Sequence, residues 1–300
     1  MLQAQFPQKQ DLAEGDESCD GAEKFCTSAS IEAIAQNDFQ LTPSLYIDSN
    51  CYLCVKSTPE DMEKLIRDLK ARGIGNHLVA CLNTWQSCLH ASTWEKAPLS
   101  AMYESLVGIC KKVSAEADAY PMVDTKTVIK YDFLPDELPV KAVVTEAEKA
   151  HFSVLAGDLL LNRTSESLHS LGQCCVSRSD SRAVYGCFLK RLRPRYSNAL
   201  YPSYVCAYFQ SAVYRKEIYD YTPRYMTRYC LNNRTMSQIS LYFPDFQTQQ
   251  RIGGILEAIF EETRHISDPD TVSVLNRLKS TLIELCITKP ILKQTITESE

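Results

Sequence analysis

The stretch "AGDLLLNRTSES", residues 156–167, places an apolar run directly before a polar cluster. Three consecutive leucines between Gly157 and Asn162 are typical of a short buried strand. The polar end could be a glycosylation acceptor, a helix cap, a catalytic hydroxyl site or a surface that contacts a ligand. Because a buried strand holds the loop that follows it in a fixed position, we expect this end of the strand to carry function.

Length and composition indicate a globular protein of two modest domains. The chain has 300 residues, of which 45% are hydrophobic and 23% charged, as in ordinary soluble domains. Its net charge of -5 excludes a uniformly basic surface but not a local basic face. We expect no bilayer span, because no apolar run reaches the required length of about 18 residues. The acidic start lacks the pattern of a secretory signal, so we expect a cytoplasmic protein.

The 13 cysteines are expected to be reduced, and most of them buried as small apolar residues. Cys51 and Cys54 have CxxC spacing, but no second pair follows at the spacing of a zinc site. Cys174 and Cys175 are adjacent in a strand pattern and therefore point to opposite faces. We expect no metal site in this chain.

The chain divides into five expected segments within an α+β (mixed α/β) fold. Residues 1–28 are acidic and predicted to be disordered. Residues 29–118 form a small α/β unit, 119–244 a β-rich module, 245–290 a helical hairpin or coiled coil, and 291–300 a tail.

Within the small α/β unit, Thr58 and Pro59 are typical of a helix start, and Gly73 or Gly75 of its end. The apolar face of this helix comprises Met62, Leu65, Ile66 and Leu69. The pattern then predicts a strand at 76–83 ("NHLVACLN") and a helix at 99–113 ("LSAMYESLVGICKKV").

The β-rich module is expected to alternate short strands with a few helical segments. A helical turn is expected at 145–152, and one helix at 202–221, opened by Pro202. Strands are predicted at 126–133, 138–145, 157–164, 172–178, 183–194 and 239–244.

The C-terminal segment shows helical periodicity on both sides of Asp268-Pro269, which interrupts it. The apolar positions fall on one face of each helix, as in a helical hairpin or coiled coil that needs a partner or the rest of the chain. These positions are Ile252, Ile255, Leu256, Ile259, Leu275, Leu278, Leu282 and Leu285.

Positive charge concentrates in residues 178–234. This window holds 11 basic and 3 acidic residues, a net charge of +8, so the rest of the chain carries −13. Ten tyrosines lie in the same window. One interpretation is a solvated basic face over a tyrosine-rich core. The other is a polyanion-binding surface, which is favoured by "YTPRYMTRYCLNNRT" (221–235), because it mixes Arg, Tyr, Thr and Asn.

Motifs of common enzymes do not occur in the sequence. It has no GxxxxGK[ST] phosphate loop, no GxGxxG fingerprint, no GxSxG elbow and no amino-methyltransferase [DNS]PP[YFW] element. Glu148 stands directly beside Lys149, the wrong spacing for a nuclease set that begins at Pro135-Asp136. The five histidines form no metal-ligand pair. We therefore expect no catalytic residue.

The order of motifs over roughly 120–287 resembles the target recognition domain of specificity (S) subunits of type I restriction–modification enzymes. The resemblance rests on "FSVLAGDLLLNRTSES…LGQCCV", on "AVYGCFLKRLRPRYSNALYPSYVCAYFQSAVYRKEI" and on "ISLYFPDFQTQQRIGGILEAIF". It implies a non-catalytic subunit that binds double-stranded DNA. It also implies that a partner methyltransferase subunit, which holds S-adenosylmethionine, modifies adenine, and that a restriction subunit cuts DNA.

Carried onto this chain, the resemblance implies three DNA-contacting loops. Asn162, Arg163 and Asn232 are expected to read bases, and most of the other arginines to bind phosphate. The complete set is Asn162, Arg163, Thr164, Ser165, Lys190, Arg191, Arg193, Arg195, Arg224, Tyr225, Thr227, Arg228, Asn232, Asn233 and Arg234. The eight apolar residues of the C-terminal helices are the expected subunit contacts.

The sequence departs from that family by having one recognition domain and one spacer where a full S subunit has two of each. Either the chain is a half-subunit that forms a homodimer through 246–287, or it is a remnant or a swapped cassette. The role of residues 29–118 stays open. A rival hypothesis is a protein-interaction module that recruits a partner through the C-terminal helices. With no sign of secretion, Asn162 and Asn233 are not expected to be glycosylated.

Overall fold

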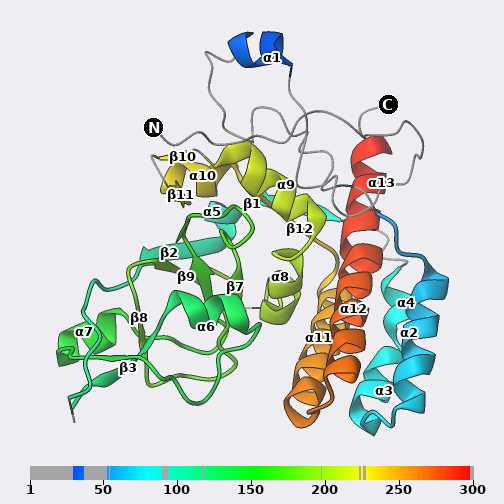
Figure 1. Cartoon of the computed structure of the whole chain (residues 1–300), viewed down its shortest axis with the longest axis horizontal. Coiled ribbons are helices and arrows are strands. Elements are labelled where there is room, and N and C mark those ends of the chain that lie inside the picture. The colour runs from blue at the N-terminus through cyan, green and yellow to red at the C-terminus, as the bar shows by residue number, and fades with distance from the viewer. Residues whose placement is uncertain are drawn as a thin grey trace, which may run out of the picture. The chain divides into compact units, whose positions relative to one another are not determined.

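The computed structural model describes residues 30–36, 53, 55–89, 94–116, 118–196, 198–222, 224–225 and 228–297. Contacts within the chain separate residues 1–51 from residues 52–300. In the first unit the described element is helix α1 (Ile31–Gln36); everything below concerns the second unit, an α+β fold (Figure 1). The predicted disorder of 1–28 and the CxxC pair Cys51 and Cys54 lie outside the described residues.

The beginning and the end of the second unit pack together as one helical part. Helices α2 (Pro59–Ala71), α3 (Asn76–Leu82) and α4 (Trp85–Cys88) contact α11 (Phe246–His265) or α12 (Pro269–Ile283). A π-helical turn (Glu284–Thr288) continues α12 into α13 (Lys289–Thr297). These helices stand beside one another in Figure 1.

Helix α2 begins and ends where the sequence predicts. The Thr58 side chain accepts from the Asp61 amide at 3.2 Å, and the Asp61 carboxylate accepts from the Thr58 amide at 2.8 Å, which completes a capping box. Met62, Leu65, Ile66 and Leu69 are buried. Gly73 has a φ of 80°, a conformation that favours glycine and ends the helix.

The break between the C-terminal helices is also confirmed. The Asp268 carboxylate accepts from the Thr271 amide at 3.0 Å and so caps α12, with Pro269 in its first turn. Helices α11 and α12 contact each other. The eight residues expected at a subunit contact are all buried inside the chain: Ile252, Ile255, Leu256, Ile259, Leu275, Leu278, Leu282 and Leu285. In this fold they therefore offer no exposed apolar seam to a second copy.

A four-stranded antiparallel sheet forms the centre of the β-rich part, in the order β2-β9-β5-β7. Its strands are β2 (Tyr103–Val107), β9 (Leu189–Pro194), β5 (Leu159–Asn162) and β7 (Cys174–Val176). Strand β5 is buried at every position, as its leucines predict. Cys174 and Cys175 belong to different apolar clusters, which confirms that they point to opposite faces.

Smaller sheets surround this centre. Strands β4 (Lys141–Ala142), β3 (Tyr120–Val123) and β8 (Val184–Tyr185) form one of them, and β10 (Arg224–Tyr225), β11 (Arg228–Cys230) and β6 (Thr164–Ser165) form another. Strand β1 (Glu95–Pro98) pairs with β12 (Ser240–Phe243). The remaining helices are α5 (Leu99–Met102), α6 (Thr125–Lys130), α7 (Glu146–His151), α8 (Pro202–Tyr208), α9 (Ala212–Tyr221) and α10 (Asn233–Gln238).

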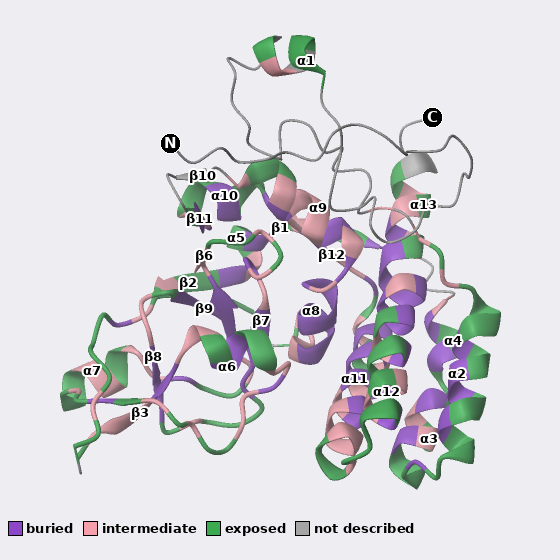
Figure 2. Ribbon diagram, in the orientation of Figure 1, coloured by how far each residue is buried: buried purple, intermediate pink, exposed green. Residues whose placement is uncertain are grey.

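Helix α8 joins the sheet to the helical part. It contacts β7 on one side and α11 on the other, and every residue after Pro202 in it is buried (Figure 2). A Cβ atom on Gly253 of α11 would lie 2.5 Å from the Tyr201 ring and 2.9 Å from the Tyr204 amide. Only glycine at this position allows the two helices to approach so closely.

Three predicted elements have the wrong type. The strand predicted at 76–83 is helix α3 (Asn76–Leu82), because Leu78 and Leu82 are buried one helical turn apart. Of the helix predicted at 99–113, only Leu99–Met102 is helical; the chain then becomes β2 and pairs with β9. Most of the strand predicted at 126–133 is helix α6, whose Asp124 cap accepts from the Thr127 amide at 2.9 Å.

Two further boundaries differ from the prediction. The helix expected at 202–221 is divided into α8 and α9, because the Ser211 side chain caps α9 by accepting from the Tyr214 amide. The boundary expected between 118 and 119 does not separate two bodies, because β2 is an edge strand of the sheet that contains β9, β5 and β7. Strands β5, β7, β9 and β12 lie within the predicted ranges.

Candidate nucleic-acid interface

Asn162 ends strand β5 inside the protein. Its side chain is 1% exposed, and its Nδ2 atom donates to the Ser170 carbonyl at 2.8 Å. Its amide donates to the Gln173 carbonyl at 2.8 Å. The expectation that Asn162 reads a base does not fit this placement, because its amide group holds the following loop and cannot reach a ligand outside.

Arg163 joins three segments at the end of the same strand. Its Nη1 atom donates to the Cys187 carbonyl at 3.0 Å, and its Nη2 atom to the Cys230 sulfur at 3.5 Å. Its own amide donates to the Phe188 carbonyl at 3.0 Å, and its carbonyl accepts from the Leu231 amide at 2.8 Å. The buried Nε atom has no hydrogen-bond partner among the described residues. The guanidinium is thus held in place with one donor unused.

Lys190, in strand β9, is 2% exposed. Its ammonium donates to the Asn233 Oδ1 atom at 2.9 Å. Burial, and then the positive charge of Arg163, lower the pKa of Lys190. Two cations that repel each other in a partly buried place favour a bound anion next to them.

The other basic residues of β9 are mostly structural. The Arg191 guanidinium is 5% exposed and donates to the Ser153 carbonyl at 2.6 Å. Arg193 forms an ion pair with the buried Asp158, with its Nε and Nη2 atoms 2.8 and 2.6 Å from the carboxylate oxygens. These placements do not fit phosphate binding by Arg191 or Arg193, because both side chains already serve internal acceptors. Arg195, just beyond the strand, is exposed.

The sheet β10-β11-β6 carries the second group of expected contacts. Arg228 is 49% exposed, lies 3.4 Å from the Glu166 carboxylate and stacks 5.7 Å from the centroid of the Phe188 ring. Thr164 contacts the Cys230 sulfur, and the Ser165 hydroxyl accepts from the Ser167 amide, so both stabilise the turn after β5. Arg224 and Tyr225 form β10; their side chains, like all of Thr227, lie outside the described residues.

The third group surrounds the start of helix α10. Asn232 caps this helix, and its Oδ1 atom accepts from the Thr235 amide at 2.9 Å, so the predicted role in base reading does not fit that oxygen. Asn233 is exposed and accepts from Lys190. Arg234 is exposed and has no ion-pair partner among the described residues.

Four of these residues form what we call the cationic cluster: Arg163, Lys190, Arg228 and Arg234. Arg163 contacts Cys230, Lys190 contacts Asn233, and Arg228 contacts Phe188, whereas Arg234 belongs to the cluster as the residue that follows Asn233. Among the described residues, Glu166 is the one carboxylate that an ion pair places beside them. With four cations and one anion, the cluster has a formal charge of +3 on a chain of net charge -5. Its members stand on strand ends and a capped helix start, which limits their motion.

Phe188 was not expected at the site. It is 49% exposed at the turn between β8 and β9, and the Arg228 guanidinium covers its ring. An exposed aromatic ring beside cations is suited to stacking on a base or sugar. In the sequence, a large apolar residue at a turn between two strands, between "GC" and "LK", could have predicted this exposed ring.

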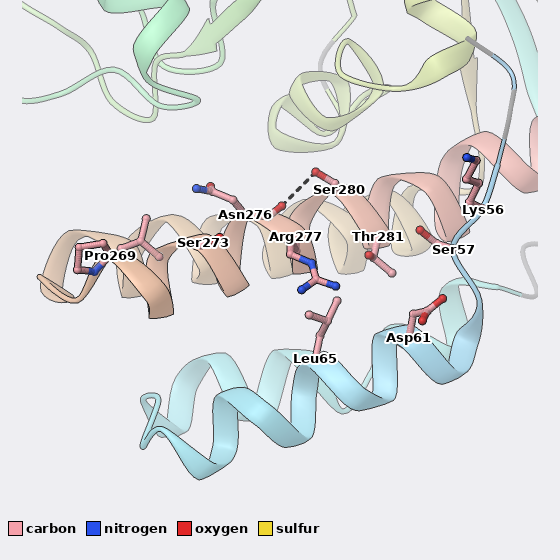
Figure 3. A pocket seen from close by; sticks show the side chains of 11 residues that line it. Lys56, Ser57, Asp61, Leu65, Pro269, Ser273, Asn276, Arg277, Ser280 and Thr281 are labelled. Carbon is pink, nitrogen blue, oxygen red and sulfur yellow. Dashed lines mark hydrogen bonds between the residues drawn. The ribbon is translucent and has the colours of Figure 1, made fainter. Parts of the chain in front are cut away.

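Candidate metal ligands and two cavities are further features of the described residues. These residues include no group of three or more His, Cys, Asp or Glu residues that could hold a metal ion. A groove of about 720 Å³ between α2 and α12 is lined by Ser57, Asp61, Asn276, Arg277 and other mostly polar residues (Figure 3). A second cavity, of about 490 Å³, contains Asp132, but this carboxylate already accepts from Lys279 at 2.8 Å and from Gln210 at 3.0 Å. No described helix is long and apolar enough to cross a bilayer.

No protein-family model and no curated protein matches this chain. Among solved structures, similar chains come from specificity subunits of type I restriction–modification systems. One is the HsdS subunit from Thermoanaerobacter tengcongensis, with 14% identity and a TM-score of 0.42 over 76% of this chain and 55% of that one. Another is the S subunit from M. genitalium, with 13% identity and a TM-score of 0.42 over 79% and 57% of the two chains. The chain thus spans little more than half the length of these relatives.

Proposed function

We propose that the β-rich part of this chain binds double-stranded DNA as the recognition module of a type I restriction–modification specificity subunit, and does not itself catalyse a reaction. The observation that carries the proposal is the cationic cluster, a fixed group of four cations with one neighbouring carboxylate on an acidic protein. The motif order that resembles target recognition domains supports the same assignment.

Within the cluster we assign different roles to different residues. Arg228 and Arg234 are the exposed cations and bind phosphate oxygens, for which guanidinium groups are well suited. Arg163 and Asn233 are the residues best placed to contact base edges, since Arg163 is half-buried, Asn233 is exposed, and Lys190 binds the Asn233 side chain beside them.

A salt titration tests this assignment. The double variant Arg228→Ala, Arg234→Ala should bind random duplex DNA more weakly, and the slope of log K against log salt should fall by about two units, because each phosphate contact contributes about 0.9. Fluorescence anisotropy at several salt concentrations measures this slope. Arg67→Ala is the matched control, because Arg67 is an exposed arginine on α2. A slope that is the same in the double variant and the control would refute the phosphate assignment.

We further propose that the helical part directs a partner methyltransferase subunit, which would hold S-adenosylmethionine, and with it a restriction subunit. Because the eight apolar residues of α11 to α13 are buried, such a contact would have to use the exposed face of α12 beside the groove in Figure 3. Arg277 stands on this face opposite Asp61, whose pKa it helps to lower after the hydrogen bonds from Thr58.

The variant Arg277→Glu separates the two roles. We expect it to weaken co-purification with the methyltransferase subunit and to leave binding of random DNA unchanged. Retained co-purification would place the partner contact elsewhere. If neither the chain alone nor the chain with its methyltransferase subunit binds DNA, the DNA-binding assignment is refuted and the rival assignment as a protein-interaction module is favoured.

A further inference from the structure

Six of the nine cysteines that the structure describes lie in three pairs of neighbouring thiols. The pairs are Cys88 with Cys286, Cys174 with Cys206, and Cys110 with Cys187. The members of the first two pairs are all buried, whereas Cys110 is exposed and Cys187 is half-buried. Only the third of these pairs is therefore open to a reagent in solution.

The backbone holds the third pair at the separation that a disulfide needs. The Ile109 amide donates to the Tyr185 carbonyl at 2.8 Å, and Ile109 pairs with Gly186 in a parallel bridge. Cys110 and Cys187 are the next residue along each segment. Paired strands lie about 4.8 Å apart, and disulfides need Cα atoms about 4.4–6.8 Å apart, so the two residues can be joined with little backbone movement.

Gly108 explains why these two segments can approach so closely. A Cβ atom at this position would lie 2.2 Å from the Gly186 carbonyl oxygen and 2.4 Å from that of Tyr185. Both atoms belong to the backbone and cannot rotate away. The short distance between the segments is thus a property of the fold and not of one side-chain rotamer.

The pair also adjoins the cationic cluster. The carbonyl of Cys187 accepts from the Arg163 guanidinium, and the carbonyl of Phe188 accepts from the Arg163 amide. The turn that carries Cys187 therefore holds Arg163 in place. A covalent bond between Cys187 and Cys110 would fix this turn to the segment that follows β2.

We propose that Cys110 and Cys187 form a thiol-oxidation site, which hydrogen peroxide or a related peroxide converts to a disulfide. The exposed Cys110 thiolate attacks one peroxide oxygen, the O–O bond breaks, and the products are a sulfenic acid and hydroxide. The Cys187 thiolate then attacks the Cys110 sulfur, the S–S bond forms and the sulfenic oxygen leaves as water. In sum, two thiols and one peroxide give one disulfide and two waters.

Burial raises the pKa of the Cys187 thiol, and a higher pKa leaves less thiolate at neutral pH. This assigns the first attack to Cys110 and the second to Cys187. Once formed, the bond closes a loop from residue 110 to residue 187 and restricts the unfolded chain, so it stabilises the protein.

The test treats the native full-length chain with a small excess of hydrogen peroxide, blocks the remaining thiols with N-ethylmaleimide and maps the peptides by mass spectrometry. We expect a peptide that joins Cys110 to Cys187, with Cys88, Cys174, Cys206 and Cys286 blocked only after unfolding in urea. We also expect a rise in Tm on the order of 5 °C that dithiothreitol reverses. Peptide mapping also shows whether the oxidised cysteines are Cys110 and Cys187 or instead Cys19, Cys26, Cys51 or Cys54.

Three variants make the result specific. Cys110→Ser and Cys187→Ser should each abolish the linked peptide and the rise in Tm. Cys230→Ser is the matched control, because Cys230 also contacts Arg163. Since Cys230 is not part of the proposed disulfide, this variant should retain both the linked peptide and the rise in Tm. Wild-type protein that yields no peptide joining Cys110 to Cys187, or that links Cys110 equally well to other cysteines, would overturn the proposal. The readout does not involve DNA, so its outcome is independent of the proposed function.

Discussion

Replacing Arg193 tests whether its charge serves the fold or a ligand. In the structure its guanidinium is 29% exposed and binds both carboxylate oxygens of Asp158, which is 1% exposed. Arg193→Ala would leave that carboxylate buried without its counter-ion. Loss of one partner of a buried ion pair costs about 3–5 kcal/mol. Because Arg193 is partly exposed and Asp158 keeps a hydrogen bond from the Leu155 amide at 2.8 Å, we expect a loss of about 2–3 kcal/mol.

Urea unfolding followed by circular dichroism measures this loss as a lower midpoint with an unchanged slope. Arg195→Ala is the matched control, because Arg195 is two residues further along, exposed, and without an ion-pair partner among the described residues. We expect it to change stability by less than about 0.5 kcal/mol. Two results would refute the structural role of Arg193. One is a loss in the free energy of unfolding below about 1 kcal/mol for Arg193→Ala. The other is a decrease of one unit in the slope of log K against log salt for DNA binding.

Three further positions test other contacts that shape the fold. Burial raises the pKa of Glu217 from 4.5 to about 7, so this carboxyl destabilises the fold increasingly as pH rises from 4.5 to 7. Glu217→Gln keeps an acceptor for the Ser240 amide and should therefore stabilise the protein at pH 8, by at most about 3 kcal/mol, and little at pH 4.5; equal effects at both pH values in urea unfolding would contradict this. Gly108→Ala should destabilise by about 1–3 kcal/mol, because its Cβ would collide with two carbonyl oxygens; an unchanged Tm would contradict this. Asp268→Ala removes the cap of α12 and should lower the urea midpoint, whereas Asp268→Asn should lower it much less.

The sequence predicted the elements whose local signals agree with their packing. Helix α2 carries a capping box, an early proline and a regular apolar face, and each of these is observed. The apolar run of β5 predicts a strand that is buried on both faces, and the sheet places it between β9 and β7. At Asp268-Pro269 a capping carboxylate followed by a proline predicts the end of one helix and the start of the next.

The failures occurred where a distant partner decides the structure. Residues 76–83 are a short apolar run that suits a strand or a helix equally well, and α11 selects the helix by packing against it. The segment after Met102 has good helix formers, but pairing with β9 makes it a strand. The caps at Asp124 and Ser211 were visible in the sequence and would have placed α6 and α9 correctly.

For the candidate site, the sequence identified which residues are basic but not what each of them contacts. It identified a basic window, and the cationic cluster is drawn from residues it named. It could not distinguish Arg193, which neutralises Asp158, from Arg234, which has no ion-pair partner among the described residues. That distinction depends on which carboxylates the fold brings near each guanidinium, and Asp158 is 35 residues away in the chain.

The pairing of β1 with β12 has a consequence for how this protein can change. Glu95 lies opposite Phe243 and Pro98 opposite Ser240, so the chain leaves the helical part and returns to it through neighbouring strands. The β-rich part is thus inserted between two paired strands, so its two ends lie side by side. Residues can be gained or lost at its outer turns without altering the distance that the helices must span. Such an arrangement permits changes on the outer surface of the β-rich part while the helical part keeps its structure.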